Sequence, residues 1–443
     1  MKASLAVVVT VLVGCALMGA PASAAPPYPV EPSVPAGTPS PLQEWIDGTV
    51  PAPPAAADDE TLWRAVLPTP TGDPIFDAWP DDLPAFAPGA IIEARDVTAT
   101  TAVRMPTPIA RATLLKFRST SATGAPSFGT ATLIVPAVPW SGPRPVEVNA
   151  LPINSLGTHC TPGYQLSHDL LDKPNLDLPV FLPAVWTALG KGHAVLLPDH
   201  EGPFMAYAEP NVAAHVVLDS IRAARGFLPG ELGESRYVAI GYSGGAIAAY
   251  AAAMKLDEYA PELNGVLAGA AAGGVVTDYV NVAHQFNGKI SSGILLTVTL
   301  AIAREHPEIL RHTNTLAQWV ATSPLRDICG ETSGPLGIVG LPVDVGADTA
   351  APLDSEFAAA LFDRFDLTDA TSPVPLYIYH GAHDPWIPLD DAERVFREQC
   401  GRGVPSVFRV VPGEHLIGYV TGAPELEGWI DGRLRGAPAP REC

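Results

Sequence analysis

One short segment, residues 237–250, restricts the possible folds of this chain more than any other. It begins with four β-branched, aromatic and small residues, continues through Gly-Tyr-Ser-Gly-Gly around Ser243, and ends in a run rich in alanine. The order strand, G-x-S-x-G, helix is typical of a nucleophile elbow, a sharp turn that exposes the serine hydroxyl at the edge of a sheet. Gly241 and Gly245 would let the backbones approach closely, and the Gly244 N–H would face a developing oxyanion. The alternative is a glycine-rich tight turn inside an ordinary α/β unit, because G-x-S-x-G alone is a weak signal.

The first residues have the pattern of a secretory signal peptide. A positive charge at Lys2 precedes an apolar run, Ala3–Met18, and a small-residue cleavage motif at Ala22–Ala24. We therefore predict that residues 1–24 are a signal peptide and that the mature chain is secreted and soluble. No later segment is long and apolar enough to be expected to span a bilayer. An alternative is a lipoprotein anchored at Cys15, which the apolar residues after this cysteine disfavour.

Charge and cysteine content narrow the choice of partners and cofactors. The chain has 26 basic and 47 acidic residues, a formal charge of −21, which argues against nucleic acids and anionic membranes as electrostatic partners. Of the five cysteines, Cys15 leaves with the signal peptide. The four that remain predict two disulfides in an oxidising compartment, with three pairings open. No C-x-x-C spacing indicates a metal site, and we expect no cofactor.

The order of predicted elements indicates an α/β fold with a mostly parallel sheet. Residues 25–85, rich in Pro, Ala and Asp, are expected to form an extended surface arm. An antiparallel hairpin is predicted next, followed by strands that alternate with helices. The predicted strands are Ala112–Ser119, Phe128–Val135, Val146–Ile153, Ala194–Pro198, Gly265–Gly273, Leu376–His380 and Val407–Val411, and the predicted helices include Asn211–Phe227 and Leu389–Cys400.

An insertion interrupts this alternation over residues 275–372. It contains two predicted helices, Ser291–Arg304 and Pro307–Gln318, and then a run rich in Gly, Pro and Asp. Because loops after parallel strands overhang their carboxyl ends, we interpret the insertion as a helical cap over the site. The alternative is an inert surface elaboration. Residues 86–274 and 373–436 would then form the core, and residues 437–443 a C-terminal tail.

A serine nucleophile needs a base and an acid that orients the base. In the order Ser, acid, His that this elbow predicts, Asp384 follows a late strand and a glycine turn, and His415 follows the last strand. His380 and His383 are rivals for the base, but they lie on the loop of the acid itself, so we interpret them as packing or loop-shaping residues. A metal patch formed by these two histidines and Asp384 is disfavoured because further ligands are missing. A second polar cluster, residues 199–201, is interpreted as structural support.

Several of these segments together resemble the secretory lipase family over residues 85–443. The residues that carry the resemblance are Gly241–Ala246, Asp199–Gly202, Tyr259–Asn264 and Cys160–Tyr164. The resemblance implies an α/β-hydrolase fold with a helical cap between nucleophile and acid, and activity on carboxylic esters, including triacylglycerols. It implies Ser243, Asp384 and His415 as the triad and the disulfides Cys160–Cys329 and Cys400–Cys443.

The chain departs from the family at one position of the oxyanion hole. Where the family has an aspartate after the first parallel strand, this chain has Asn154. The backbone N–H groups of Asn154 and Gly244 would still serve as donors, and the asparagine amide adds a donor without charge. The alternative is that Asn154 only shapes a turn.

The predicted function is that of a secreted triacylglycerol lipase acting on a lipid or ester substrate, with a lipid–water interface as a further expected partner. Alternatives are a short-chain carboxylesterase, an acyltransferase, and a non-catalytic lipid-binding protein on the same scaffold. The oligomeric state does not follow from the sequence.

Overall fold

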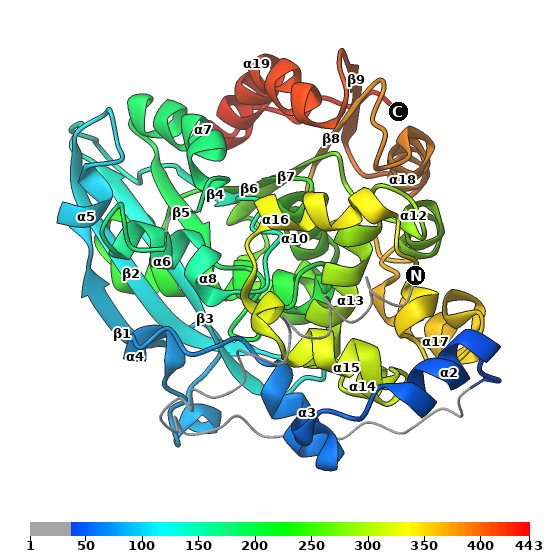
Figure 1. Cartoon of the computed structure of the whole chain (residues 1–443). Helices are drawn as coiled ribbons and strands as arrows, with labels where there is room; N and C mark the ends of the chain where they lie inside the picture. Colours follow the sequence, from blue (N-terminus) through cyan, green and yellow to red (C-terminus); the bar gives the residue numbers. More distant parts are fainter. Residues whose placement is uncertain (1–36, 174) are drawn as a thin grey trace.

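A nine-stranded sheet forms the centre of the molecule (Figure 1). The computed structural model describes residues 37–173 and 175–443, so the predicted signal peptide and Cys15 lie outside the described residues. The strand order is β1-β2-β3-β5-β4-β6-β7-β8-β9. The strands are β1 (Ile91–Asp96), β2 (Ile109–Thr120), β3 (Pro126–Pro136), β4 (Val146–Ala150), β5 (Ala194–Pro198), β6 (Tyr237–Tyr242), β7 (Leu267–Gly273), β8 (Leu376–Gly381) and β9 (Ser406–Val411). Strands β4 to β9 are parallel to one another and β1 to β3 are antiparallel, which confirms the predicted α/β class.

Apolar side chains on both faces of the sheet require helices on both sides. In β6, Tyr237 and Ala239 join the core on one face, and Val238 and Ile240 join the core on the other. The first face is covered by α8 (Pro210–Phe227), α10 (Gly244–Met254) and α18 (Leu389–Gly401). The second face is covered by α6 (Pro162–Ser167), α7 (Leu178–Gly190) and α19 (His415–Leu434).

The predicted core strands are present with small shifts at their ends. The strand expected over Val146–Ile153 ends at Ala150, and the strand expected from Gly265 begins at Leu267. After β4 the chain leaves the sheet, and Asn154 adopts a positive φ of 50° that a continuing strand does not allow. This early exit leads the chain toward the end of β6.

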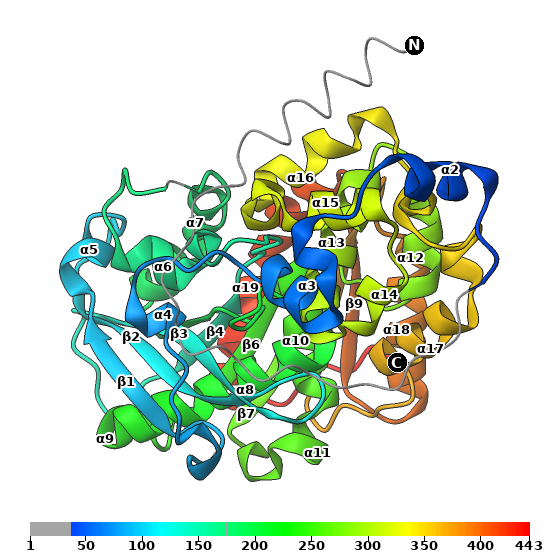
Figure 2. The ribbon, with the colours of Figure 1, turned by 60° about the horizontal axis from the view of Figure 1, so that its bottom comes forward.

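The insertion between β7 and β8 is mainly helical, as predicted, and forms the yellow and yellow-green layer beside the sheet in Figures 1 and 2. Its α-helices are α12 (Tyr279–Phe286), α13 (Ser292–Glu305), α14 (Glu308–Arg311), α15 (Thr315–Thr322), α16 (Gly330–Leu336) and α17 (Glu356–Phe365). The prediction of a single helix over Pro307–Gln318 was wrong, because two separate helices, α14 and α15, occupy this segment. The Asn314 side chain caps α15 by accepting the Ala317 N–H, and its own backbone N–H donates to the Gly346 carbonyl (3.0 Å). Such a cap starts a new helix and ends the preceding one.

The segment before β1 is not an extended arm over its described length. It contains α2 (Pro41–Thr49), α3 (Asp59–Val66) and α4 (Pro74–Asp77), and α2 and α3 lie against the cap helices in Figure 2. Trp63 in α3 is fully buried, and its Nε1–H donates to the Arg304 carbonyl of α13 (2.8 Å). The prediction from composition was wrong here because burial against the cap stabilises short helices that are weak in isolation.

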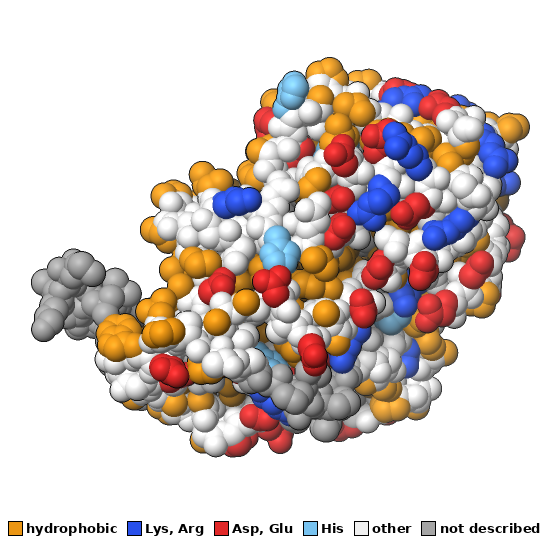
Figure 3. Space-filling model, turned by 90° about the vertical axis from the view of Figure 1, so that its right-hand side faces the viewer, with side chains coloured by type: hydrophobic (Ala, Val, Ile, Leu, Met, Phe, Trp, Pro, Cys, Tyr) orange, Lys and Arg blue, Asp and Glu red, His pale blue; other side chains and the backbone are white. Residues whose placement is uncertain are grey.

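Acidic and basic side chains are dispersed over the face of the molecule shown in Figure 3. They are interspersed with apolar ones, so the negative formal charge is not gathered in one patch there. In the described ranges, no helix combines the length and the apolar character needed to cross a membrane.

Candidate active site

Ser243 occupies a strained turn between the last residue of β6 and the first residue of α10. Its backbone has φ 54° and ψ −122°, a combination that L residues rarely adopt. Backbone hydrogen bonds hold the turn: the Ser243 N–H donates to the Gly273 carbonyl (2.8 Å), and the Ser243 carbonyl accepts the N–H groups of Ala246 (2.9 Å) and Ile247 (3.3 Å). The segment therefore has the strand-to-helix geometry that the motif predicted.

Close backbone contacts account for the two flanking glycines. A Cβ at Gly245 would collide with the carbonyl of Ala150 in β4, and a Cβ at Gly241 would collide with the carbonyl of Gly245. The obstacles are backbone atoms, which cannot rotate away, so neither position has room for a side chain.

Replacing Gly245 with alanine is expected to lower the free energy of unfolding by about 3 kcal/mol or more, because β4 and the elbow must separate to admit the methyl group. Thermal unfolding monitored by circular dichroism would measure the change. The matched control is Gly428→Ala in α19, where the added Cβ has no neighbour within 4 Å among the described atoms. That substitution should stabilise the helix by up to about 1 kcal/mol. Equal unfolding temperatures for the two variants would contradict the close contact at Gly245.

His415 and Asp384 form a buried hydrogen-bonded pair. His415 is the first residue of α19, and its Nδ1–H donates to Asp384 Oδ2 at 2.5 Å. The other carboxylate oxygen, Oδ1, accepts the backbone N–H groups of Trp386 (2.9 Å) and Ile387 (3.0 Å). The Asp384 side chain is fully buried and that of His415 is 3% exposed. The bond at Nδ1 directs Nε2 of the imidazole away from the carboxylate.

The surroundings of Asp384 keep its carboxyl group ionised. Burial alone would raise the pKa of Asp384, but hydrogen bonds from His380, His415 and the Ile387 N–H outweigh burial and hold the pKa well below its usual range. The carboxylate can therefore stabilise positive charge on the neighbouring imidazole.

The imidazole of His415 lies beside the elbow. The Tyr242 hydroxyl, one residue before Ser243, donates to the His415 carbonyl, and the two ring centres are 5.1 Å apart. A Cβ at Gly274, just after β7, would lie 2.9 Å from His415 Cε1. The His415–Asp384 pair thus lies beside the turn that carries Ser243, after the ends of β6, β8 and β9.

The two residues predicted for an oxyanion hole also lie together. A Cβ at Gly244 would collide with Oδ1 of Asn154, so the asparagine side chain covers the first residue of α10, next to Ser243. Asn154 Oδ1 is buried and has no hydrogen-bond partner within the described part of the chain. The Gly244 N–H is one of the donors that a helix leaves free at its N-terminus.

A buried carboxyl group supports the Asn154 loop. The Ser155 N–H lies 3.4 Å from Glu201 Oε1, and Glu201 is 1% exposed. Burial raises the pKa of Glu201 well above its usual range, although the N–H groups of Ser155 and Asn154 and the charge of Arg304 oppose this shift. Burial therefore disfavours the charged form of Glu201.

The other two members of this cluster also contact backbone, in agreement with a structural role. Asp199 accepts the Gly163 N–H (2.8 Å) and the Thr130 hydroxyl (2.5 Å), and His200 Nε2–H donates to the Leu151 carbonyl (2.9 Å). Burial raises the pKa of Asp199 to about 7 and lowers that of His200 to about 4. His200 thus holds the chain that leaves β4, and Asp199 joins α6 to β3.

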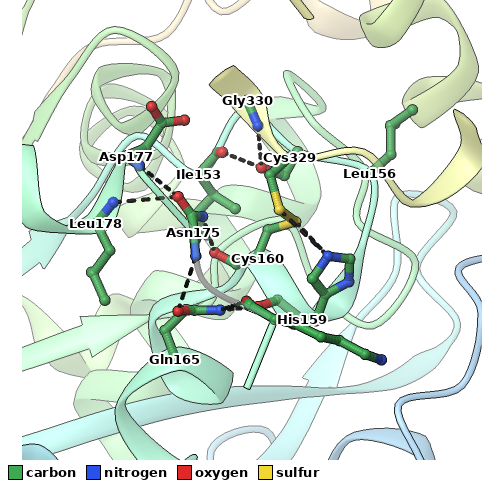
Figure 4. Close-up of a disulfide and its surroundings, with 12 residues drawn as sticks. Ile153, Leu156, His159, Cys160, Gln165, Asn175, Asp177, Leu178, Cys329 and Gly330 are labelled. Carbon is green, nitrogen blue, oxygen red and sulfur yellow. Dashed lines mark hydrogen bonds between the residues drawn. A yellow bond between two sulfur atoms is a disulfide. The ribbon is translucent and has the colours of Figure 1, made fainter. Parts of the chain in front are cut away.

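The Cys160–Cys329 disulfide joins the core to the cap beside this loop (Figure 4). On the cap side of the bridge, the Gly330 N–H donates to the Ser155 hydroxyl (3.0 Å). The start of α16 is thus attached both covalently and by a hydrogen bond to the segment that follows Asn154.

The second bridge, Cys400–Cys443, attaches the C-terminal residue to α18. Both pairings are those that the family resemblance implied. Within the described ranges, the single group of three candidate metal ligands with atoms within 4.8 Å of one another is His159, Cys160 and Cys329. Two of its members are the sulfurs of the first disulfide.

Arg304 is a structural residue that the sequence analysis missed. Its side chain is fully buried at the end of α13, and burial lowers its pKa to about 9. The guanidinium donates to the carbonyls of Leu156 (2.8 Å), Phe204 (3.0 Å), Val66 (3.0 Å) and Arg326 (2.5 Å). It therefore joins the Asn154 loop, the chain after β5, the end of α3 and the cap. The one signal in the sequence is an arginine at the end of a largely apolar helical segment.

Comparison with known protein families identifies the chain. The family described as "Secretory lipase" matches residues 180–441, more than half of the chain. The chain belongs to the secretory lipase family. This secretory lipase is thus an ester hydrolase of the triacylglycerol lipase type.

Relatives of this secretory lipase align over most of their length. It is 29% identical to Lipase 10 of Candida albicans over 397 residues, which are 85% of this chain and 83% of the relative. It is 28% identical to Lipase A of Moesziomyces aphidis (83% and 81% covered) and to "Probable inactive lipase MT1628" of Mycobacterium tuberculosis (86% and 86% covered). The crystal structure of Candida antarctica lipase A in its closed state superposes with a TM-score of 0.75 at 24% identity, covering 85% of this chain and 90% of that chain. This likeness confirms the α/β-hydrolase fold.

Proposed function

We propose that this lipase is a secreted serine hydrolase that cleaves carboxylic esters, triacylglycerols above all, through an acyl-enzyme formed on Ser243. The observation that carries the proposal is that the strained turn at Ser243 lies beside the buried His415–Asp384 pair. Within that pair, His415 Nδ1 is 2.5 Å from Asp384 Oδ2. A serine hydroxyl becomes a nucleophile when an oriented imidazole takes its proton.

In the proposed mechanism, the Ser243 oxygen attacks the ester carbonyl while His415 Nε2 takes the hydroxyl proton. Asp384 keeps the proton on Nδ1 and stabilises the imidazolium that forms. The tetrahedral intermediate collapses, and His415 returns its proton to the departing alcohol. Water then attacks the acyl-enzyme while His415 takes one of its protons. The second intermediate collapses, His415 gives that proton to the Ser243 oxygen, and the carboxylic acid departs.

The oxyanion of each tetrahedral intermediate would lie between Gly244 and Asn154. The Gly244 N–H lies at the start of α10, where a helix leaves its first donors unpaired, and it is the first proposed donor. The N–H of Asn154 is the second proposed donor, and because it also faces the carboxyl group of Glu201 it would be shared between that group and the oxyanion. The side chain of Asn154 supplies a third polar group without a charge. Because an amide does not titrate, this hole would be independent of pH in the range where an aspartate would ionise.

We also propose a division of the chain into a signal peptide, a catalytic core, a cap and a C-terminal tail. Residues 1–24 would direct secretion. Residues 86–274 and 373–436 would form the catalytic core, residues 275–372 the cap, and residues 437–443 the tied tail. The contacts at Gly330 and Arg304 place the cap next to the Asn154 loop.

Exposed apolar side chains on the cap support a substrate met at a lipid–water interface. Ile290, Ile338 and Val339 are 71%, 74% and 79% exposed, and the Ile290 carbonyl lies against Gly337, so the two segments adjoin. Large exposed apolar side chains that gather in one place mark surfaces that contact lipid or another protein. Ile338 and Val339 follow α16, which begins at the disulfide beside Asn154.

The double variant Ile338→Ser/Val339→Ser is expected to lower activity on emulsified triolein about tenfold, because two apolar side chains are lost from the adsorbing surface. Activity on soluble p-nitrophenyl butyrate should stay within about twofold of wild type, since neither side chain belongs to the proposed triad. The control is Val103→Ser, a 67% exposed valine at the end of α5 (Thr98–Ala102), far from α16 in Figure 1. Equal losses on both substrates would contradict a role in adsorption.

The proposed function is tested by the substrate range of the purified mature protein. Rates on p-nitrophenyl esters from two to sixteen carbons and on emulsified triolein are measured, and the residue labelled by a fluorophosphonate is mapped by mass spectrometry. Turnover of long-chain esters and triolein with the label on Ser243 is the expected result.

Each alternative function has its own signature in that experiment. Turnover confined to the shortest esters would make the protein a short-chain carboxylesterase. Preferential formation of a new ester when an alcohol is added would make it an acyltransferase. Absence of both turnover and label would leave a non-catalytic lipid-binding protein.

A further inference from the structure

His380 is a buried histidine next to the acid of the site, and the proposed mechanism gives it no role. It is the penultimate residue of β8, and its side chain is fully buried. His383, three residues later, is exposed. The sequence analysis interpreted both histidines as packing or loop-shaping residues, but their surroundings differ.

The contacts of His380 determine where its proton lies. Its Nε2 is 2.9 Å from the Ile387 carbonyl oxygen and 3.3 Å from Asp384 Oδ2. Both neighbours are acceptors, so Nε2 must carry the proton. Nδ1 is buried and has no hydrogen-bond partner among the residues described. The ring is thus held as a donor at Nε2 and is not placed to act as a general base.

The same ring closes the turn that presents Asp384. The Ile387 carbonyl accepts the His380 Nε2–H, while the Ile387 N–H donates to Asp384 Oδ1 (3.0 Å). Ile387 is therefore held on both of its polar groups, and the carboxylate is held on both of its oxygens. Oδ2 faces two imidazoles, that of His415 at 2.5 Å and that of His380 at 3.3 Å. Without the His380 imidazole, the Ile387 carbonyl would lose its donor and Asp384 Oδ2 would lose one of its two imidazole neighbours.

We propose that His380 is a positioning residue of the catalytic pair: its Nε2–H holds the turn at Ile387 and faces Oδ2 of Asp384, which keeps the carboxylate aligned with Nδ1 of His415. The proposal rests on the proposed triad and adds to it a second imidazole behind the acid. If Asp384 shifts when His380 is lost, the shift affects Ser243 only through His415. The variant should therefore have a lower kcat and a nearly unchanged KM.

Removing His380 has an effect on pH dependence whose sign follows from the contacts of Asp384. Among the described residues, two further titratable groups lie near the pair: the Tyr242 hydroxyl from β6, which donates to the His415 carbonyl, and Glu414, the residue that caps α19. The contact with His380 is one of the interactions that lower the pKa of Asp384, so its removal raises that pKa. A higher pKa of Asp384 moves the acidic limb of the activity profile to higher pH, because the ionised carboxylate is then lost at a higher pH.

The test compares His380→Met with His380→Gln, since methionine and glutamine have similar size but only glutamine keeps an N–H donor near the position of Nε2. His380→Met is expected to lower kcat about tenfold with KM nearly unchanged, and to move the acidic limb of kcat/KM upward by about half a pH unit or more. His380→Gln should recover most of kcat and restore the position of the limb. His383→Gln, the exposed neighbour, should behave as wild type in both respects.

Two results would overturn the proposal. One is an unshifted acidic limb and unchanged kcat in His380→Met; the other is an equal loss in the Met and Gln variants, which would indicate packing alone. If thermal unfolding shows that the Met variant does not fold, the Gln variant still tests the proposal. A positioning role requires that the acidic limb of kcat/KM in His380→Gln agrees with wild type within experimental error. Failure of the triad itself would be seen separately, as full activity in Ser243→Ala.

Discussion

Replacing Ser243 with alanine is expected to lower kcat/KM on p-nitrophenyl esters by about 10⁴-fold or more, one of the two largest changes we predict. Without the hydroxyl, no acyl-enzyme forms, and the remaining rate comes from binding and the oxyanion donors alone. The loss should appear equally on short-chain esters, long-chain esters and emulsified triolein, because all of them would be cleaved by the same nucleophile.

The alanine variant should retain the native fold. Serine already occupies the unfavourable conformation at φ 54°, and alanine meets the same restriction, so the substitution adds no backbone strain. Circular dichroism and the unfolding temperature should match wild type, and fluorophosphonate labelling should disappear. Equal activity of the two proteins would show that Ser243 is not the nucleophile.

Replacing Asp384 with asparagine is expected to lower kcat by about 10³- to 10⁴-fold while leaving the fold intact. Oδ1 of this residue accepts the N–H groups of Trp386 and Ile387, so the amide oxygen of an asparagine must take that place. The amide NH₂ would then face Nδ1 of His415, where the carboxylate now accepts a hydrogen bond at 2.5 Å. Two donors cannot pair, so the imidazole must carry its proton on Nε2, and it cannot then accept the proton of Ser243.

The measurement is kcat and KM across pH for Asp384→Asn, with Asp390→Asn as the control. Asp390 is an exposed aspartate in the first turn of α18, six residues further along the chain. Its replacement should change kcat by less than about twofold. Comparable losses in the two variants, or a loss in Asp384→Asn that appears only in KM, would contradict the assigned role.

The parts of the site that were predictable lie in short segments with their own local pattern. Strand β6, the turn at Ser243 and helix α10 follow one another within 18 residues, Tyr237–Met254. Asp384 and His415 each follow a strand whose apolar pattern is visible in the sequence. Because the carboxyl ends of parallel strands share one edge of the sheet, the order of strands alone predicts that these residues meet.

The errors have a common cause in contacts between distant segments. The Pro- and Ala-rich composition before β1 predicted an extended arm, yet Trp63 is buried against Arg304, 241 residues later. The break between α14 and α15 depends on Asn314 and its partner Gly346. In both cases burial or a backbone partner outweighs local preference.

The amino-acid sequence by itself determined the α/β alternation, the strained turn at Ser243 and the order Ser243, Asp384, His415, because these depend on neighbours in the chain and on the periodicity of strands and helices. Only the tertiary structure decided that Arg304 joins four separate segments, that Glu201 lies under the Asn154 loop, and that His380 faces Asp384 while His383 faces solvent. Those facts depend on burial and on hydrogen-bond partners that the folded chain brings together, and no local pattern of residues specifies them.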